Sequence, residues 1–497
     1  MSTIVIPPGR CLRTLPRALR PSTAPFSTST HRSLPAPAKK KTGTFAPPKR
    51  GERTLKLKKR DVVRETRPPA PGERKAVRKR IVLSNTNALE PAGLVDLTAD
   101  MAGAEEVRGR VVGIPGEVVD ALRVVEGFKV GQGWAFFRRP AALMRNEVVE
   151  LAREMEGVEQ ARGADERAVG SGVRDLGGQT LRKLVYGERG TGKSVLLLQA
   201  MATAFLRGWV VISIPEARDL YLGQTEYAPL PNTSPVQYTQ NEYTAKLLAQ
   251  IAKANRPVLS KLKLTHAHNL PIKIKPGLTL DAFAELGVND PEIAWPVFQA
   301  LWTELTAPAA EADAEGKAVA VPRPQILLAI DNVAPILRPT QYKTLDADGK
   351  LRPIHPQDFV LVKHFLDYFR GARTLPQGGL VLAATSGNET VKSDALSVGI
   401  AMAEARVANP ENKQLKLGDF WNLYKEMDMR SLEAVMDVEA LKLEGLSKAE
   451  ARAVIEYWAG NGMVRSRVEE GFVGEKWTLA GGGVVGELEK AVVRMRF

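Results

Sequence analysis

The residues with the clearest chemistry form one glycine-rich segment. From Gly187 to Ser194 the sequence matches the pattern G-x-x-x-x-G-K-[ST] at every fixed position. Glycines let backbone N–H groups approach phosphate oxygens without a Cβ clash, and a following helix adds the positive end of its dipole. The pattern predicts a P-loop in which Lys193 reaches the β- and γ-phosphates and the Ser194 hydroxyl ligates Mg²⁺; the competing interpretation is a plain glycine turn. The nucleotide-contacting residues would be Gly187, Glu188, Arg189, Gly190, Thr191, Gly192, Lys193, Ser194 and Val195.

The elements expected around this segment are those that a P-loop requires. Lys183–Tyr186 can form a short strand, and Lys193–Arg207 is a helix-forming run without Gly or Pro that stops at Gly208. Trp209–Ile214 then has the composition of a buried strand. A strand, a helix and a strand joined by a crossover of about 20 residues form a right-handed unit with parallel strands. We therefore expect an α/β fold, a P-loop NTPase sheet of the AAA or STAND kind flanked by helices.

An acidic residue at the end of a second apolar run supports this interpretation. Ile326–Asp331 has the form of a Walker B strand, so Asp331 would hold Mg²⁺ through water at the carboxyl edge of the sheet. Many buried strands end in Asp, and the pairing with the P-loop is what favours this role. The next residue is Asn332, where AAA-type enzymes usually have a Glu that activates the attacking water. Because an amide cannot accept that proton, we assign no catalytic residue and expect at most slow hydrolysis.

Two further features concern the nucleotide. Gly379–Ala384 predicts a third apolar strand, and the polar run Thr385–Asn388 that follows contains either a sensor of the γ-phosphate or a simple turn. The guanine-specifying pattern [NT]-K-x-D is missing from the chain. The residues therefore leave the base open between guanine and adenine.

The positive charge of the chain is confined to its N-terminal part. Residues 1–80 hold 22 Lys and Arg against 4 Asp and Glu, whereas the remainder carries a net charge of −4. Residues 1–30 are rich in Arg and Ser and free of acids, which predicts a mitochondrial transit peptide, with a merely basic tail as the alternative. Residues 31–80 are expected to be a disordered arm, because charge repulsion and proline oppose packing. Its basic clusters suit RNA phosphates, and a solvated linker is the alternative.

Three folded parts are expected beyond the arm. Residues 81–180 would be an extension packed on the core, in which Gln132–Pro140 is more readily a packed strand than a nucleic-acid contact. Residues 181–410 would be the nucleotide-binding domain, with inserted helices and a flexible surface loop over 307–324. The inserted helices are expected at Asn241–Asn255 and Pro291–Thr306.

Residues 411–497 would form a mostly helical C-terminal domain. Ser447–Glu450 is a capping box that opens an amphipathic helix. Short strands are expected around Met463–Val468 and Lys476–Leu479. A helix followed by a two-stranded wing resembles a winged helix, the usual lid of AAA-like and STAND modules.

Composition excludes several classes of protein. The single cysteine, Cys11, rules out disulfides and cysteine-based zinc sites within the chain. No apolar run approaches the roughly 18 residues of a membrane-spanning helix, so no membrane span is expected.

Five segments of the chain point to a known family: Leu184–Ser194, Asn85–Glu90, Gln132–Trp134, Ile330–Asn332 and Gly445–Ala451. Together they resemble the death-associated protein three family of mitochondrial small-subunit ribosomal proteins. The resemblance runs from about residue 81 to the C-terminus, and the P-loop alone would be generic. The resemblance implies a head component of the mitochondrial small ribosomal subunit, located in the matrix, that contacts rRNA and neighbouring ribosomal proteins and faces the large subunit across a bridge. It also implies bound GTP or GDP with Mg²⁺, with ATP as the alternative.

Three functions fit these observations. The first is a structural ribosomal protein whose bound nucleotide orders the fold. The second is a matrix AAA-like ATPase that remodels a partner, against which Asn332 and the basic arm both argue. The third is a nucleotide switch of the STAND type.

Overall fold

The computed structural model describes most of the chain beyond its N-terminal 80 residues. All described residues belong to one unit, Lys79–Phe497. The expected transit peptide (1–30), the basic arm (31–80) and Asn388 lie outside the described residues. The described ranges are 81–168, 179–275, 277–307, 309–312, 318–321, 323–345, 349–387, 392–408, 417–422 and 424–493.

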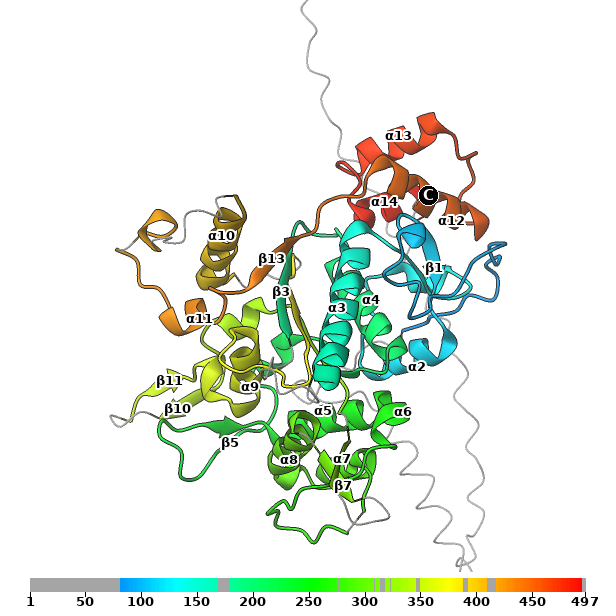
Figure 1. The fold of residues 1–497 in the computed structure, drawn as a ribbon. Helices are drawn as coiled ribbons and strands as arrows, with labels where there is room; N and C mark the ends of the chain where they lie inside the picture. The colour runs from blue at the N-terminus through cyan, green and yellow to red at the C-terminus, as the bar shows by residue number, and fades with distance from the viewer. Residues whose placement is uncertain are drawn as a thin grey trace, which may run out of the picture. The chain divides into compact units, whose positions relative to one another are not determined.

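Five parallel strands form the sheet at the centre of the unit (Figure 1). Their order is β13-β3-β12-β9-β4, so β12 lies between the strand that precedes the P-loop and the expected Walker B strand. The parallel α/β sheet and the four strands expected from the sequence are confirmed. The strands are β3 (Thr180–Tyr186), β4 (Val210–Ile214), β9 (Ile326–Asp331), β12 (Gly379–Ala384) and β13 (Glu439–Lys442).

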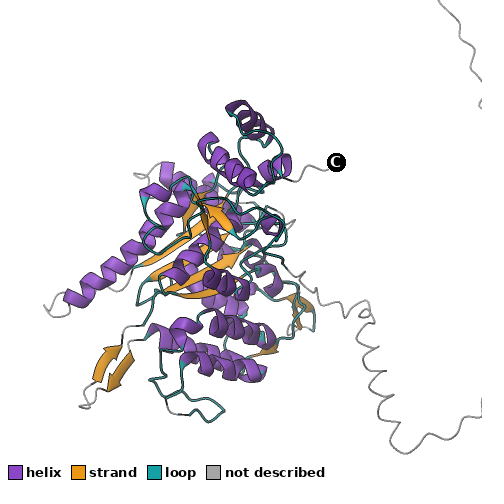
Figure 2. Ribbon diagram, turned by 90° about the vertical axis from the view of Figure 1, so that its right-hand side faces the viewer, coloured by secondary structure: helices purple, strands orange, loops and turns teal. Residues whose placement is uncertain are grey.

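Both faces of this sheet are buried, which is why its strands are nearly continuous apolar runs. Alternate side chains enter two different cores, with Ile212 and Leu328 in one and Val211 and Leu327 in the other. Helices cover both faces, as Figure 2 shows. The first core is covered by α5 (Asn241–Ala254), α6 (Arg256–Leu259), α7 (Leu280–Asn289), α8 (Ala294–Thr306), α9 (Val360–Phe369), α10 (Asp394–Ala408) and α11 (Met429–Glu433). The second is covered by α2 (Gly116–Val124), α3 (Asn146–Ala168) and α4 (Lys193–Leu206).

Helices α5 to α8 are inserted between β4 and β9, as the sequence predicts. The flexible loop expected over 307–324 contains two paired strands, so that prediction is wrong in part. The alternating Ala and Val of Ala318–Val321 suit a strand. The short antiparallel pairs are β7 (Ala309–Ala312) with β8 (Ala318–Val321), β5 (Ala228–Pro229) with β6 (Tyr238–Thr239), and β10 (Lys343–Leu345) with β11 (Leu351–Pro353). Short 3₁₀ helices are η4 (Ala217–Leu220), η5 (Pro291–Ile293), η6 (Ala334–Leu337), η7 (Pro356–Asp358) and η8 (Leu417–Asp419).

The extension before β3 packs on the face that carries α4. Its strands β1 (Val111–Gly113) and β2 (Ala141–Leu143) are antiparallel, and η1 (Glu105–Val107) precedes them. The strand expected within Gln132–Pro140 is wrong, because Gly133–Phe136 forms the 3₁₀ helix η2. The expected packing of this segment is present. Trp134 is buried edge-to-face against Phe128, and its indole N–H donates to Gln132 Oε1 at 2.5 Å.

The C-terminal part is mostly helical, as expected, but the wing of the winged helix is not formed. Helix α12 (Lys448–Gly460) begins at the predicted capping box. The segment expected as a second strand lies inside α13 (Glu470–Leu479). Packing decides this local choice, because the Trp477 indole N–H donates to the Leu446 carbonyl at 2.7 Å and this contact joins α13 to the start of α12. The last helix is α14 (Val485–Val492). No described helix is both long and apolar enough to cross a bilayer.

Candidate nucleotide-binding site

The backbone of the P-loop explains why its glycines are needed. Gly187, Gly190 and Gly192 have φ angles of 147°, 85° and 102°, a region that side chains rarely adopt. At Gly187 a Cβ would also lie 2.3 Å from the carbonyl oxygen of Leu443, in the segment after β13. The loop therefore depends on glycine both for its own shape and for the approach of the C-terminal segment.

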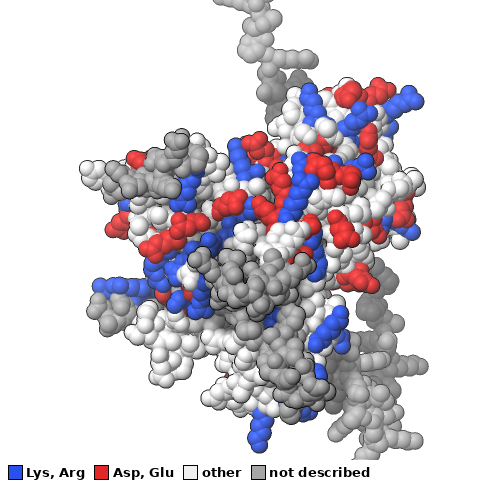
Figure 3. Space-filling view, viewed as in Figure 1, with Lys and Arg blue, Asp and Glu red and all other residues white. Residues whose placement is uncertain are grey.

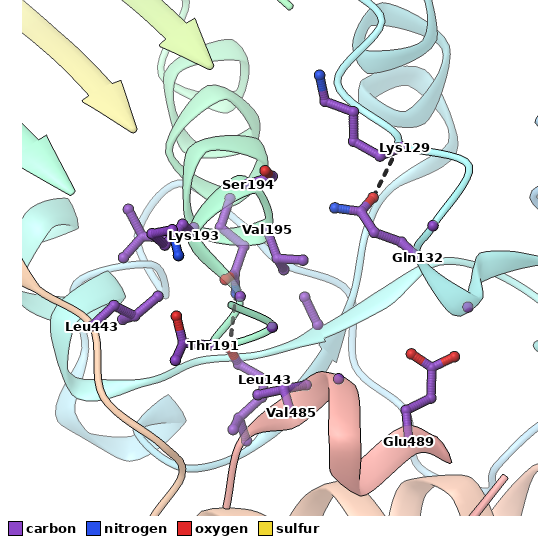
Figure 4. A pocket seen from close by; sticks show the side chains of 18 of the residues that line it. Lys129, Gln132, Leu143, Thr191, Lys193, Ser194, Val195, Leu443, Val485 and Glu489 are labelled. Atoms are coloured by element: carbon purple, nitrogen blue, oxygen red, sulfur yellow. Dashed lines mark hydrogen bonds between the residues drawn. The ribbon is translucent and has the colours of Figure 1, made fainter. Parts of the chain in front are cut away.

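The reactive side chains of the P-loop follow directly at the start of α4. Lys193 Nζ donates to the carbonyls of Gly187 at 2.9 Å and Glu188 at 2.6 Å. Burial lowers the pKa of Lys193 below its usual 10.5, although the negative charge of Asp331 opposes this effect. Ser194 and Val195 line the same cavity, and Figure 4 shows them beside Lys193.

Residues at the carboxyl edge of the sheet complete the end of the cavity that lies beside the P-loop. Asp331 ends β9, and Thr385 and Ser386 follow β12 between Asp331 and the P-loop. The structure thus brings the expected Walker B acid and the expected polar run to the P-loop. The carboxylate of Asp331 and the hydroxyl of Ser194 are hard oxygen donors of the kind that Mg²⁺ prefers. The described residues contain no cluster of three His, Cys, Asp or Glu suited to a metal.

A second lysine enters this edge from the N-terminal extension. Lys129 Nζ lies 3.1 Å from Asp331 Oδ2 and also donates to the Pro215 carbonyl after β4. The Lys129 backbone N–H donates to Gln132 Oε1 at 2.9 Å, the bond drawn in Figure 4. The sequence did not indicate this role, because nothing local to Lys129 relates it to a strand some 200 residues later.

A carboxylate from the neighbouring strand also reaches the site. Glu216 follows the end of β4, and its Oε1 accepts a hydrogen bond of 2.8 Å from Asn332 Nδ2. Burial raises the pKa of Glu216 above its usual 4.5, while the bond from Asn332 and the charge of Lys129 act in the opposite direction. The sequence did contain a signal for Glu216, because this acid follows the buried strand β4. In a parallel sheet the carboxyl end of β4 lies at the same edge as Asp331.

A buried arginine joins the P-loop to two other parts of the chain. Arg145 precedes α3, and its Nη1 donates to the Thr191 carbonyl at 3.0 Å. Its Nη2 donates to the Glu444 carbonyl at 2.9 Å, in the segment between β13 and α12. Arg145 therefore fixes the extension, the P-loop and the C-terminal segment relative to one another.

Away from the phosphate end, the cavity becomes apolar. Its volume is about 490 Å³, large enough for a small-molecule ligand. The backbone N–H of Gly486, in α14, donates to the Gly190 carbonyl at 2.9 Å, so the last helix closes directly on the P-loop. The apolar lining comes from the extension and the C-terminal helices and includes Phe137, Leu143, Val454, Tyr457, Trp458 and Val485.

The parallel sheet, the glycine loop between β3 and α4, and the acid at the end of β9 define an α/β fold of the P-loop NTPase class. The sequence model of the family described as mitochondrial ribosomal death-associated protein 3 matches residues 143–491. The chain belongs to this family, which confirms the resemblance and the location in the mitochondrial ribosome.

Two relatives bear the name small ribosomal subunit protein mS29. The one from Neurospora crassa is 43% identical over 441 residues, which span 88% of this chain and 86% of the relative. The one from Schizosaccharomyces pombe is 23% identical over 77% of this chain and 71% of the relative. Among solved structures, the ORC2 protein of Aeropyrum pernix matches 68% of this chain and 60% of its own length, at 13% identity and a TM-score of 0.28.

Proposed function

We propose that this protein is a structural component of the mitochondrial small ribosomal subunit whose fold is ordered by a bound purine nucleotide, GTP in preference to ATP. The family membership carries the ribosomal part of this proposal. The geometry of the P-loop carries the nucleotide part, because Gly190 and Gly192, both with positive φ, line one cavity with Lys193 and Ser194. Backbone N–H groups at a helix N-terminus are suited to phosphate.

A nucleotide in this cavity would touch three parts of the chain. The phosphates would contact the P-loop and the sheet edge, and the base would lie against the apolar wall formed by the extension and helices α12 and α14. A ligand that binds only the folded state stabilises it by about 2.7 kcal/mol at 100 times its Kd. The nucleotide would therefore stabilise the packing of the extension and helices α12 and α14 against the P-loop and the sheet edge.

Mg²⁺ belongs to the same proposal. Ser194 would supply a hydroxyl ligand and Asp331 would hold the ion through water. The ion would neutralise phosphate charge beside a carboxylate that already pairs with Lys129. Lys129 is therefore a second source of positive charge at this edge, independent of the ion.

A carboxylate in the cavity supports guanine over adenine. Glu489 of α14 lines the cavity, and Figure 4 shows its carboxylate directed into it. Guanine presents N–H donors on the edge where adenine has an acceptor, and carboxylates accept from such donors. Glu489→Gln should weaken the binding of GDP and leave that of ADP within about twofold. An equal loss for both nucleotides would exclude a base-reading role.

The nucleotide part is tested with the purified full chain. Wild-type protein should release close to one equivalent of nucleotide on denaturation, identified by chromatography, and Lys193→Ala should release none. Lys246→Ala is the matched control, because Lys246 is a half-exposed lysine on α5 that pairs with Glu126. Wild-type protein that retains no nucleotide and shows no affinity for GDP or ADP in titration calorimetry would refute this part.

The ribosomal part concerns rRNA, neighbouring proteins and a bridge to the large subunit. On the face in Figure 3 both basic and acidic side chains are exposed among the described residues. We assign RNA contact to the basic arm, residues 31–80, because its clusters of Lys and Arg are suited to RNA phosphates. In a sucrose gradient of mitochondrial lysate the protein should migrate with the small subunit, also after EDTA separates the subunits. Deleting 39–80 should weaken this association at raised salt. Crosslinks to large-subunit proteins in intact ribosomes would test the bridge.

A further inference from the structure

The register of the sheet places a carboxylate where the Walker B segment lacks one. In the parallel pair of β4 and β9, Ile214 lies opposite Ile330. Glu216 and Asn332 each follow two residues later, so both side chains emerge at the same edge. The bond of 2.8 Å from Asn332 Nδ2 to Glu216 Oε1 shows that they meet.

We propose that Glu216 is the general base of a slow nucleoside triphosphatase activity, taking the role that Asn332 cannot perform. This inference rests on the proposed nucleotide binding and extends it to a reaction. Glu216 lines the same cavity as Lys193, Ser194 and Asp331, so its carboxylate belongs to the phosphate end of the site.

The reaction is hydrolysis of a bound nucleoside triphosphate by water. The water oxygen forms a bond to the γ-phosphorus, and the bond between that phosphorus and the β–γ bridging oxygen breaks. One proton of the water passes to the Glu216 carboxylate and is later released to solvent. The products are the nucleoside diphosphate and inorganic phosphate.

Asn332 has a defined part in this arrangement. Its amide N–H orients the Glu216 carboxylate, and its Oδ1 is buried with no hydrogen-bond donor among the described residues. A water molecule donates two hydrogen bonds. One is accepted by Glu216 and the other by Asn332 Oδ1, which orients the water oxygen toward the phosphate. Asn332 has a positive φ of 60°, a left-handed conformation that Asn adopts more readily than most residues.

The charges around Glu216 affect its strength as a base. Burial raises its pKa most, the hydrogen bond from Asn332 and the charge of Lys129 lower it, and the charges of Asp331 and Asp219 raise it further. A base whose pKa is raised toward the working pH accepts a proton more readily than an exposed glutamate does. The rate of hydrolysis should therefore increase with pH through a midpoint above the usual 4.5 of glutamate.

The test measures phosphate release in a single turnover. The purified full-length chain is loaded with GTP or, in a parallel assay, with ATP. Glu216→Gln should lower the rate by about 100-fold or more, the usual contribution of a general base. Its affinity for the nucleotide should stay within about threefold, because Gln keeps the size and the acceptor for Asn332. Glu226→Gln is the control, since Glu226 is an exposed acid beyond η4 that does not line the cavity.

A second measurement needs no kinetic assay, because it identifies the nucleotide that each protein retains during purification. Wild-type protein should co-purify with the diphosphate, and Glu216→Gln should retain the triphosphate. Equal rates in the two proteins, or no hydrolysis by a wild-type protein that binds nucleotide, would overturn the role of Glu216 and leave nucleotide binding intact. A wild-type protein that binds no nucleotide would overturn both proposals.

Discussion

Substituting Arg145 tests whether hydrogen bonds between distant parts of the chain hold the nucleotide site together. Its side chain is 9% exposed and donates to the carbonyls of Thr191 and Glu444. The substitution Arg145→Met keeps most of the buried apolar volume and removes both hydrogen bonds. The Nε contact with Glu147 at 3.4 Å is also lost, but that carboxylate remains accessible to water.

The expected magnitude follows from these bonds. A hydrogen bond from a charged group contributes about 1.5–3 kcal/mol, and the loss of a donor leaves a buried carbonyl unsatisfied. Two such bonds give roughly 3–6 kcal/mol, and we expect the lower end because Met retains the packing. If the substitution destabilises the nucleotide-binding conformation of the folded protein, each loss of about 1.4 kcal/mol raises the Kd for the nucleotide about tenfold.

Urea denaturation measures the free energy of unfolding, and titration calorimetry with GDP measures the Kd. Arg153→Met is the control, because Arg153 lies nearby in α3 but is 44% exposed. Its partners are the Gly103 carbonyl and Glu105. Such a surface contact should contribute about 1 kcal/mol or less. If Arg145→Met is no more destabilising than Arg153→Met, the buried guanidinium does not hold the site.

Three further predictions concern other parts of the unit. Glu304→Ala should lower the free energy of unfolding by about 3–5 kcal/mol in urea, because it removes the carboxylate that pairs with the fully buried guanidinium of Arg323 at 2.8 Å. Gly187→Ala should raise the Kd for GDP at least about tenfold, since its Cβ would collide with the Leu443 carbonyl and its φ is left-handed. At Asp428 burial disfavours the charge, but hydrogen bonds from a serine and a histidine outweigh it and lower the pKa below 3.8. The stability that Asp428 contributes is present above its unfolded-state pKa and is lost as pH falls through the folded-state value, and Asp428→Asn should remove this acid-dependent loss in melts from pH 6 to 2.

The parts of the site that the sequence predicted are those with a local signal. The P-loop, the strand ending at Asp331 and the helix after Lys193 each depend on residues within about 15 positions, and all three are present. The arrival of Lys129 and Glu216 at the same edge depends on the order and register of strands far apart in the chain. No spacing rule in one sequence specifies that register.

The prediction of a two-stranded wing near the C-terminus was wrong for a related reason. A ten-residue segment such as Glu470–Leu479 has no strong period of either kind, so its neighbours decide between helix and strand. The contact of Trp477 with Leu446 and the burial of Val473 among the C-terminal helices stabilise the helix. Sequence patterns therefore predicted the phosphate end of the cavity better than its apolar wall, which is built by tertiary packing.

The connections around the P-loop indicate what the nucleotide would stabilise. The central sheet is buried on both faces by large cores, of which only a few residues, such as Trp134, Leu196 and Leu443, also line the cavity. The C-terminal helices have a small separate core, and they reach the P-loop through the bond from Gly486 to Gly190 and through Glu444, which Arg145 holds. Removing the nucleotide should therefore make α12 to α14 more mobile while the sheet remains folded. The helices lose their contacts with the nucleotide, whereas the sheet keeps almost all of its core. In hydrogen exchange, the amides of Val485–Val492 should lose protection in the nucleotide-free protein, and those of β9 and β12 should keep it.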